Sequence, residues 1–288
     1  MRVGVVDIGT NSMRMLITDG EHDYGRWEEV TGLGRGVDRS GALSEDAIAR
    51  TIGAFERFGM LMAEHEVAHR AAMATSASRD ASNRESFFDR AEPALGVRPR
   101  LISGAEEARY AYAGATALWD GPRPWAVSDI GGGSTELVTE DLEMSVDIGS
   151  VRLTERWFDT RPVSGDRLNE ARSEVHSMFQ AVPRIDVGSL LGVGGSWTEM
   201  GGLIGGPARD IDLAEVTLDE MRELVGTLAE LTIAETADLP TLNPKRSETI
   251  LGGAVVAEAV MTILGADSAR QSVADTLDGL ARELLDLT

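Results

Sequence analysis

The chain contains two closely similar stretches, Val5-Val-Asp-Ile-Gly-Thr-Asn-Ser12 and Val127-Ser-Asp-Ile-Gly-Gly-Gly-Ser-Thr-Glu136. In each, a short apolar run ends in an aspartate, and a tight glycine turn with hydroxyl or amide side chains follows. Glycine lets backbone N–H groups converge on phosphate oxygens, while Ser and Thr hydroxyls add donors without bulk. The repetition therefore predicts two phosphate-binding loops, one in each of two lobes that hold the same phosphate chain.

The acidic residues of these loops are candidate metal ligands. Asp7 and Asp129 end their strands, where a carboxylate can hold a hydrated Mg²⁺ or orient a water. Glu136 can face the same cation as Asp129, or it can be an exposed residue at the start of a strand. Neither loop has the Gly-Lys-Ser/Thr of a P-loop or the G-x-G-x-x-G spacing of a dinucleotide fold.

The composition is that of a globular protein of two ordinary domains. The 288 residues are 42% hydrophobic and 26% charged. The lack of cysteine excludes disulfides and thiolate chemistry. The net charge of −21 argues against binding to nucleic acid or to an anionic membrane, but not against a small polyanion held by local cations. No signal peptide or apolar run of about 18 residues is evident, so we expect a soluble, cytoplasmic protein.

The apolar pattern predicts an α/β fold that restarts half-way along the chain. The first half reads β-β-β-α-β-α-β-α, the order of an actin-like nucleotide-binding lobe, with strands at 2–8, 13–18, 26–31, 70–74 and 98–102 and helices at 44–64 and 83–95. The second half has strands at 125–130, 136–139, 144–148 and 190–193 and helices at 150–158 and 165–181, and the capping box Thr217-Leu-Asp-Glu220 opens a further helix. Ser247 is expected to cap a long helix that runs to about 264 in a position between the lobes, and a last helix is expected at 275–287. We expect lobe I to span 1–120 with a C-terminal helix at about 275–288, and lobe II to span 121–274.

The segment Ile102-Ser-Gly-Ala-Glu-Glu-Ala-Arg109 contains two adjacent glutamates, Glu106 and Glu107, whose roles can be explained separately. Ser103 and Glu106 form the S-x-x-E capping box at the start of a helix. Glu107 is not needed for that box. It can be the general base that activates water, or a solvated acid of the first turn that is favoured by the helix dipole.

Three other features have a functional and a structural interpretation. Arg14 and Arg79 are candidate phosphate clamps, although with 26 arginines any one of them can be a surface ion pair. The loop Gly192-Val-Gly-Gly-Ser196 is either a tight strand-to-helix turn or a contact for a terminal phosphate through Gly195 and Ser196. His65-Glu-Val-Ala-His69 matches a zinc-protease pattern, but we expect His69 to leave the helix and enter a strand.

These motifs resemble those of the exopolyphosphatase and guanosine pentaphosphate phosphohydrolase (Ppx/GppA) family. The resemblance covers nearly the whole chain and includes Ala74-Thr-Ser-Ala-Ser-Arg-Asp-Ala81, Gly149-Ser-Val-Arg-Leu-Thr-Glu155 and Asn243-Pro-Lys-Arg246. It implies two actin-like, ribonuclease H-like lobes of the sugar kinase, Hsp70 and actin superfamily around an interdomain cleft. The chain looks like the short form of the family, without the C-terminal HD-type extension.

The resemblance also implies roles for the candidate residues. Glu107 corresponds to the catalytic base, and Asp129 and Glu136 correspond to metal-associated acids, with Asp7 in the first phosphate loop. The expected metal ligands are thus Asp7, Asp129 and Glu136, and the cofactor is Mg²⁺ or Mn²⁺. The expected phosphate-binding residues are Gly9, Thr10, Asn11, Ser12, Arg14, Arg79, Gly131, Gly132, Gly133, Ser134, Thr135, Gly195 and Ser196.

The sequence predicts a Mg²⁺-dependent exopolyphosphatase that removes the terminal phosphate of inorganic polyphosphate, with a preference for short chains because the surface is acidic. Hydrolysis of guanosine pentaphosphate (pppGpp) at the same site is the neighbouring alternative. An actin-like ATPase or sugar kinase and a non-catalytic phosphate or alarmone sensor are more distant alternatives. The expected partners are polyphosphate or pppGpp, with no nucleic acid and no membrane, and a homodimer is one option for the assembly.

Overall fold

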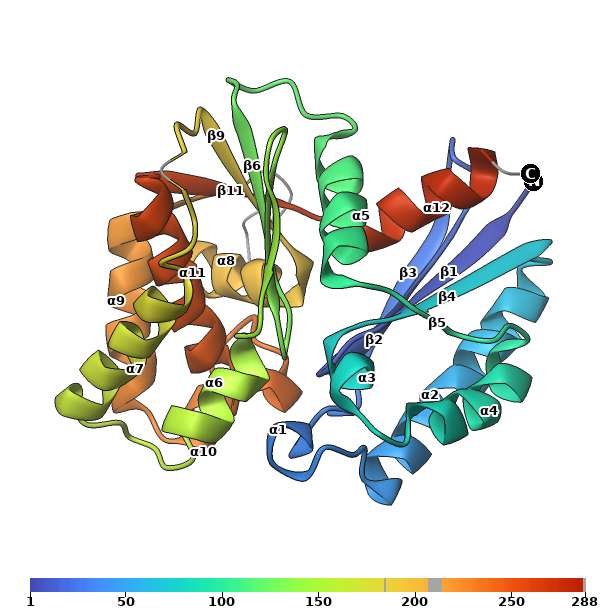
Figure 1. The fold of residues 1–288 in the computed structure, drawn as a ribbon, viewed down its shortest axis with the longest axis horizontal. Coiled ribbons are helices and arrows are strands. Elements are labelled where there is room, and N and C mark those ends of the chain that lie inside the picture. The colour runs from blue at the N-terminus through green and yellow to red at the C-terminus, as the bar shows by residue number, and fades with distance from the viewer. Residues whose placement is uncertain (184, 207–213, 287–288) are drawn as a thin grey trace. The chain divides into compact units, whose positions relative to one another are not determined.

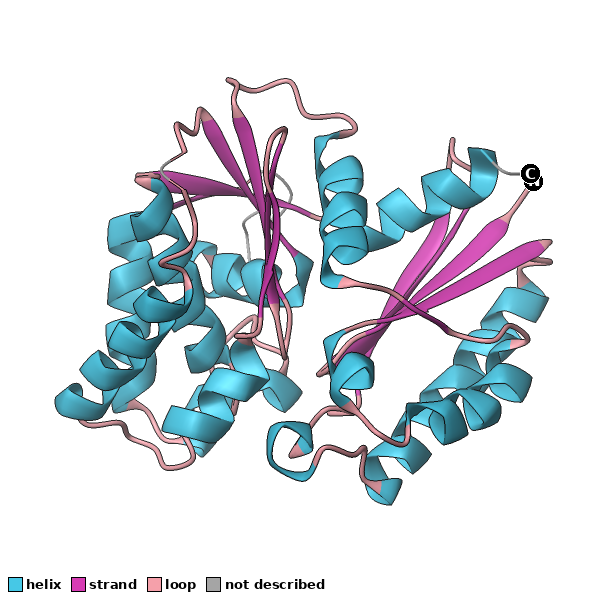
Figure 2. Cartoon of the chain, in the orientation of Figure 1, coloured by secondary structure: helices cyan, strands magenta, loops and turns pink. Residues whose placement is uncertain are grey.

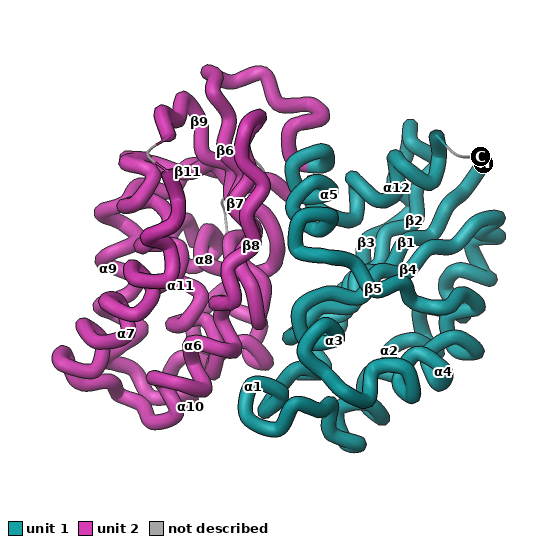
Figure 3. The backbone as a smooth tube through the Cα atoms, viewed as in Figure 1, with its two compact units in different colours: residues 1–114, 275–288 teal, residues 115–274 magenta. Residues whose placement is uncertain are grey.

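The computed structural model describes residues 1–183, 185–206 and 214–286. The chain forms two compact units, which are coloured separately in Figure 3. Unit 1 comprises Met1–Gly114 and Asp275–Thr288, and unit 2 comprises Ala115–Ala274. Each unit contains one sheet covered by helices (Figures 1 and 2).

Unit 1 has a five-stranded sheet of order β3-β2-β1-β4-β5. Strand β1 is antiparallel to β2, to which a hairpin connects it, and parallel to β4, to which a crossover connects it. The strands are β1 (Val3–Ile8), β2 (Ser12–Thr18), β3 (Asp23–Val30), β4 (His69–Ala74) and β5 (Arg100–Leu101). The helices are α1 (Val37–Ser40), α2 (Glu45–Glu64), α3 (Ser76–Asp80), α4 (Arg84–Leu95), α5 (Gly104–Thr116) and α12 (Thr276–Asp286).

Unit 2 repeats this plan in a six-stranded sheet of order β10-β11-β9-β6-β7-β8. Read from β8, the first five strands have the order of unit 1, and β10 is an addition. The strands are β6 (Trp125–Ile130), β7 (Thr135–Thr139), β8 (Glu143–Val146), β9 (Ser189–Val193), β10 (Glu215–Thr217) and β11 (Ser268–Ser272). The helices are α6 (Ser150–Trp157), α7 (Gly165–Met178), α8 (Gly194–Gly205), α9 (Leu218–Glu230), α10 (Ile233–Ala237), the 3₁₀ turn η1 (Pro244–Arg246) and α11 (Ile250–Leu264). The predicted α/β fold class, with a similar lobe in each half of the chain, is confirmed.

The alternation of side chains along β1 separates two layers in unit 1. Val6 and Ile8 belong to the core beneath α2 and α4, whereas Val3 and Val5 pack with Leu277 of α12 on the other face. Successive side chains of a strand point to opposite faces, so the odd-numbered Asp7 lies on the α12 face. The position of the candidate metal ligand is therefore fixed by the apolar pattern of its own strand.

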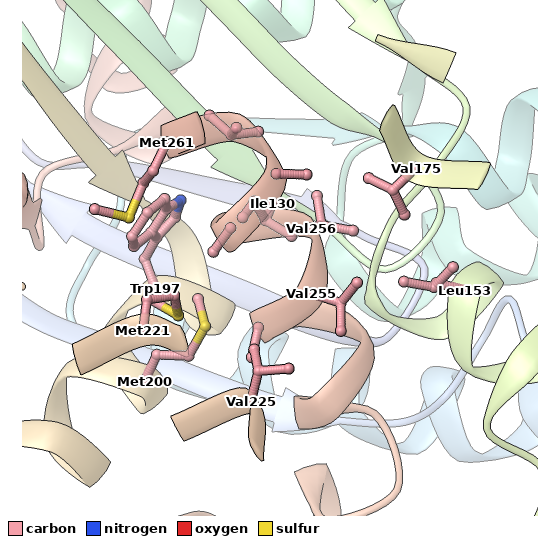
Figure 4. Packing of buried hydrophobic residues seen from close by; sticks show 14 of the residues in the cluster. Ile130, Leu153, Val175, Trp197, Met200, Met221, Val225, Val255, Val256 and Met261 are labelled. Atoms are coloured by element: carbon pink, nitrogen blue, oxygen red, sulfur yellow. The ribbon is translucent and has the colours of Figure 1, made fainter. Parts of the chain in front are cut away.

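The core of unit 2 is built around α11 and α8 (Figure 4). Twelve of the fifteen α11 residues are buried, and the helix packs against α6, α7, α8, α9 and β6, all elements of unit 2. This packing within unit 2 is sufficient to explain the apolar surface on all sides of α11. Trp197 of α8 is fully buried, and its indole Nε1 donates to Ser128 Oγ at 3.4 Å. Ser128 thus gives the buried indole N–H an acceptor within a largely apolar strand.

Most predicted elements are present, with shifts at their ends. Ser44 caps α2 and Thr217 forms the predicted capping box of α9, because each side chain accepts the expected backbone N–H. The prediction that Ser247 caps the long helix is wrong: Ser247 ends η1, and α11 begins at Ile250 after Thr249. The last two residues of the predicted C-terminal helix, 287 and 288, lie outside the described residues.

The two histidines of the zinc-protease pattern do not share a helix. His65 is the C-cap of α2, and His69 is the first residue of β4, as predicted. The pattern needs both imidazoles on one helix face, so it has no such meaning in this chain. Within the described ranges, no helix is both long and apolar enough to cross a membrane.

Candidate active site

The first hairpin loop is closed by a bond between Gly9 N and Ser12 O of 3.1 Å. A Cβ on Gly9 would lie 2.9 Å from that same carbonyl oxygen, so this close approach favours glycine. Asn11 O accepts from Thr31 N at 3.0 Å and from Gly32 N at 2.8 Å, and Thr10 O accepts from Gly34 N at 2.8 Å. In a trans peptide the next N–H points opposite to the carbonyl. The N–H groups of Asn11 and Ser12 are therefore directed away from segment 31–34, which donates to these carbonyls.

Several buried polar atoms of the first loop have no hydrogen-bond partner within the part of the chain that the structure describes. They are Asp7 Oδ1, Thr10 Oγ1, and Asn11 Oδ1 and Nδ2. The three residues are only 4 to 7% exposed. A buried polar group without a partner costs about 1–3 kcal/mol, so four such atoms in one loop are expected only where a ligand or ordered water completes them.

Arg14 lies between two carboxylates. Asp7 and Arg14 are directly paired across β1 and β2, so their side chains share a face of the sheet. Arg14 Nη2 and Nε donate to Asp7 Oδ2 at 2.6 and 3.2 Å, and Nη1 donates to Asp275 Oδ2. The guanidinium therefore positions Asp7 and leaves its Oδ1 directed elsewhere.

The adjacent glutamates at the start of α5 have the separate positions that the sequence predicts. Glu106 Oε2 accepts from Ser103 N at 2.8 Å, and Ser103 Oγ accepts from Glu106 N at 3.2 Å, which completes the predicted capping box. The bonds that Ser103 N and Ser103 Oγ donate to the Glu106 carboxylate, together with an ion pair to Arg100, lower the pKa of Glu106. Glu107 is 8% exposed, and its Oε2 accepts from Arg79 Nη1 at 2.8 Å. The pair joins two predicted site residues from α3 and α5.

The second hairpin loop has the geometry of the first. Gly131 N donates to Ser134 O at 3.0 Å, the counterpart of Gly9 and Ser12. Its carbonyls are bound by the start of α6, since Gly131 O accepts from Ser150 N at 2.9 Å and Gly132 O accepts from Val151 N at 2.8 Å. The N–H groups of Gly132 and Gly133 consequently point away from α6.

Gly149 makes this contact between α6 and the second loop feasible. A Cβ at Gly149 would lie 2.6 Å from Gly131 O and 2.7 Å from Gly132 O. Thr135 Oγ1 donates to Ile148 O at 2.7 Å, which holds the loop from its other end. The hydroxyl of this predicted phosphate-binding residue is therefore used in the structure to fix the loop.

Asp129 and Glu136 are directly paired across β6 and β7, so their side chains share a face of the sheet. They occupy the places that Asp7 and Arg14 occupy in unit 1, with the cation replaced by a second carboxylate. Asp129 is 6% exposed and Glu136 is fully buried, with Glu136 Oε1 accepting from Ser145 Oγ at 2.7 Å. Two carboxylates directly opposite each other repel, and a cation on this face would relieve the repulsion.

The third glycine loop forms the N-terminus of α8. Gly194 has a φ of +82°, and a Cβ there would lie 2.6 Å from Asp129 Oδ1. A Cβ at Gly195 would lie 2.1 Å from Nη2 of Arg246, a residue that is 4% exposed. Arg246 Nε also lies 3.6 Å from Glu199 Oε1. Glycine at these positions lets a carboxylate and a guanidinium approach the helix N-terminus closely, where N–H groups attract anions.

The candidate metal ligands fit a cation that is shared with a phosphate better than one held by protein alone. No group of three or more acidic, histidine or cysteine side chains forms a metal cage among the residues described. Mg²⁺ is usually held by one or two carboxylates together with substrate phosphates and water. Unit 1 offers one such carboxylate through Asp7 Oδ1. Unit 2 offers two, through Asp129 and Glu136.

Asp275 and Arg246 are site neighbours that sequence reasoning missed as functional residues. Asp275 is far from Arg14 in sequence, and its local signal is an Asp-x-x-Asp pattern at the start of α12. Arg246 is part of the quoted Asn243-Pro-Lys-Arg246 motif, and its contact with Gly195 depends on the fold. Ser78 Oγ is also buried without a hydrogen-bond partner among the described residues, next to Arg79.

Comparison with known proteins identifies the family. The model of the Ppx/GppA phosphatase family matches residues 17–283. This chain belongs to the Ppx/GppA phosphatase family. The resemblance carried by the motifs is thereby confirmed.

Individual members of the Ppx/GppA family match over nearly their full lengths. Exopolyphosphatase 2 of Mycobacterium tuberculosis is 35% identical to this chain, and the match covers 98% of each protein. The crystal structure of an exopolyphosphatase-like protein is 33% identical, with a TM-score of 0.95 over 100% of this chain and 99% of that one. The Aquifex aeolicus family member is 28% identical, with a TM-score of 0.81 and the same coverage. The chain thus shares both the sequence features and the fold of the family.

Proposed function

We propose that this protein is an exopolyphosphatase, a phosphoric anhydride hydrolase that removes the terminal phosphate of inorganic polyphosphate. The main structural support is the first hairpin loop, where four buried polar atoms of Asp7, Thr10 and Asn11 have no hydrogen-bond partner among the described residues. A phosphate group supplies acceptor oxygens for the donors of Thr10 and Asn11. Its cation supplies positive charge for the carboxylate of Asp7. The relative from Mycobacterium tuberculosis that is named an exopolyphosphatase supports the same substrate class.

The phosphate groups are proposed to bind the loops that end β1 and β6 in their respective units. In both, the loop carbonyls are bound by neighbouring backbone, which directs the following N–H groups the other way. Such N–H groups bind anions well. Gly9 to Ser12 and Gly131 to Thr135 remain the proposed phosphate contacts, with Gly195, Ser196 and Arg246 as a further contact at the N-terminus of α8.

Glu107 is the proposed general base. Its carboxylate is nearly buried and is oriented by Arg79, and the capping role at this helix start is taken by Glu106. Glu107 would accept a proton from the attacking water as the oxygen bonds to the terminal phosphorus and the bridging P–O bond breaks. Arg79 keeps the carboxylate directed during this transfer.

The proposed cofactor is Mg²⁺ or Mn²⁺. Asp7 in unit 1, and Asp129 with Glu136 in unit 2, are the residues that would hold it. When bound, a divalent cation neutralises phosphate oxygens and so favours attack by water. The donor set consists of carboxylates alone, as hard cations of this kind prefer.

The decisive experiment measures phosphate release from short and long polyphosphate, pppGpp and ATP, with and without Mg²⁺. We expect the highest kcat/KM on polyphosphate, and on short chains in particular because of the −21 net charge. A higher kcat/KM on pppGpp would establish the alarmone activity instead, and binding without release would indicate a sensor. The cytoplasmic location and the homodimer stay predictions, which fractionation and gel filtration can test.

A further inference from the structure

We infer that Asp275 is a positioning residue that sets the cation affinity of Asp7 through Arg14. This inference deepens the proposed function and rests on it, because it concerns the proposed metal ligand of unit 1. The evidence is a buried chain of three charged groups: Asp7, Arg14 and Asp275, whose side chains are 9, 14 and 9% exposed.

Arg14 joins the two carboxylates. Its Nε and Nη2 both donate to Asp7 Oδ2, while Nη1 donates to Asp275 Oδ2. A guanidinium shared by two carboxylates leaves the three groups with a net charge of −1. Asp7 alone with Arg14 would have a net charge of zero, and a divalent cation near Asp7 Oδ1 would then gain much less attraction.

Asp275 is itself held in place at the start of α12. It is the residue before α12, and its Oδ1 accepts from Leu277 N at 2.9 Å while its own N donates to Asp278 Oδ2 at 2.7 Å. One carboxylate oxygen therefore caps the helix and the other holds Arg14. The orientation of Arg14 is thus fixed by a helix whose first turn is itself well anchored.

The start of α12 also lies close to α5, the helix that carries Glu107. A Cβ at Gly114 of α5 would lie 1.9 Å from Asp275 O, and a Cβ at Gly279 of α12 would lie 2.2 Å from Tyr110 O. The backbones of α5 and α12 therefore approach closely at two glycines. Asp275 stands where the chain re-enters unit 1, and Gly114 where the chain leaves it. The first turn of α12 is thus braced against α5 as well as against Arg14.

The test separates the charge of Asp275 from its capping role. Asp275→Ser keeps a good N-cap but is too short to hold Arg14, and Asp275→Asn keeps the size without the charge. Both variants should raise the Mg²⁺ concentration for half-maximal phosphate release about tenfold or more, the scale of a lost hydrogen bond between charged groups. At saturating Mg²⁺ most of kcat should return.

A control and a double variant identify the route. Glu283→Gln removes a negative charge from α12 away from Arg14, at a side chain whose Oε2 accepts from Tyr110 Oη at 2.9 Å. This variant should leave the Mg²⁺ requirement unchanged. In an Arg14→Gln background, Asp275→Ser should have a much smaller effect than in the wild type, because the two residues act as one unit. Equal effects in both backgrounds would show that Asp275 does not act through Arg14.

A binding measurement distinguishes failure of this inference from failure of the proposed function. Mn²⁺ binding is followed by electron paramagnetic resonance in the Glu107→Gln background with inorganic phosphate present, and the Asp275 variants should bind more weakly by the same factor. If the wild type hydrolyses no polyphosphate but Mn²⁺ binding weakens as expected, the proposed function is wrong and the inference stands. Unchanged Mn²⁺ binding together with an unchanged Mg²⁺ requirement would refute the inference alone.

Discussion

Arg79 of α3 donates to Glu107 Oε2 of α5 over 2.8 Å, which brings together two residues that are 28 positions apart in the chain. The neighbouring Glu106 is occupied by Ser103 and Arg100. Two adjacent carboxylates thus have different partners and different surroundings, which makes them a matched pair for mutation.

The first prediction uses this pair. Glu107→Gln should lower kcat for phosphate release by about 10² or more, because a neutral amide cannot accept the proton of water. Glu106→Gln should retain most of the activity and lose mainly part of the helix cap. Circular dichroism should show that both variants are folded. Equal losses of activity in the two variants would argue against Glu107 as the base.

The second prediction concerns the buried hydroxyl of Thr10. Thr10→Val keeps the shape and removes an Oγ1 that has no hydrogen-bond partner among the described residues, so the ligand-free protein should gain stability of about 1 kcal/mol. The KM for tripolyphosphate should rise several-fold if the hydroxyl donates to phosphate.

Thr51→Val is the matched control for this change. Thr51 is fully buried, but its Oγ1 donates to Thr31 Oγ1 at 3.0 Å. That variant should lose about 1 kcal/mol in urea unfolding and leave KM unchanged. A loss of stability in Thr10→Val as large as in the control would mean that Thr10 is structural.

The third prediction tests the glycines at the start of α8. Gly194→Ala places a Cβ 2.6 Å from Asp129 Oδ1 at a φ of +82°. The strained backbone alone should cost about 1–2 kcal/mol, and displacement of Asp129 should lower kcat/KM at least tenfold if that carboxylate holds the metal. Steady-state kinetics and urea unfolding measure the two effects.

Gly226→Ala serves as the comparison for that variant. Gly226 lies within α9, and a Cβ there would have no atom of another described segment within 4 Å. Alanine there should stabilise the protein by about 0.5–1 kcal/mol and leave the kinetics unchanged. Full activity in Gly194→Ala would show that the close approach to Asp129 has no functional importance.

The fourth prediction concerns acid stability. The pKa of Glu106 lies below its ordinary value of 4.5, chiefly because Ser103 N–H donates to it. A carboxylate whose pKa is lower in the folded state stabilises that state above the unfolded pKa, and this stabilisation is lost as the pH falls through the folded pKa. Glu106→Gln should therefore reduce the fall in unfolding free energy below about pH 4.5. Urea titrations between pH 3 and 7, about the range of carboxyl titration, measure this slope; identical slopes for variant and wild type would contradict it.

The sequence predicts best what is encoded locally. The hairpins around Gly9 and Gly131, the capping boxes at Ser103 and Thr217, and the strand at His69 depend on residues a few positions apart, and the structure contains them. The short helices α1 and α3 and the strands β10 and β11 are not predicted, since their few residues have no clear periodicity and depend on neighbouring elements.

Contacts between distant segments account for the rest. Arg14 and Asp275 are 261 positions apart, and Gly195 meets Arg246 only because η1 returns to the start of α8. The sequence indicates that Arg14 belongs to the phosphate loop, but it does not reveal the two carboxylates that share its guanidinium. Ser247 shows that a local signal can also mislead. Serine is a good N-cap residue, but here it follows the 3₁₀ turn η1 and does not begin the helix.

The paired hairpins differ in one consequential exchange: the position of Arg14 in the first is taken by Glu136 in the second. The aspartate of the first hairpin is balanced by a cation from its own chain, whereas that of the second has another acid beside it. The two halves therefore carry opposite charges at this corresponding position of the hairpin. Exchange of these two side chains, Arg14→Glu with Glu136→Arg, would place a new carboxylate beside Asp275, so the exchanged molecule would not be equivalent to the original.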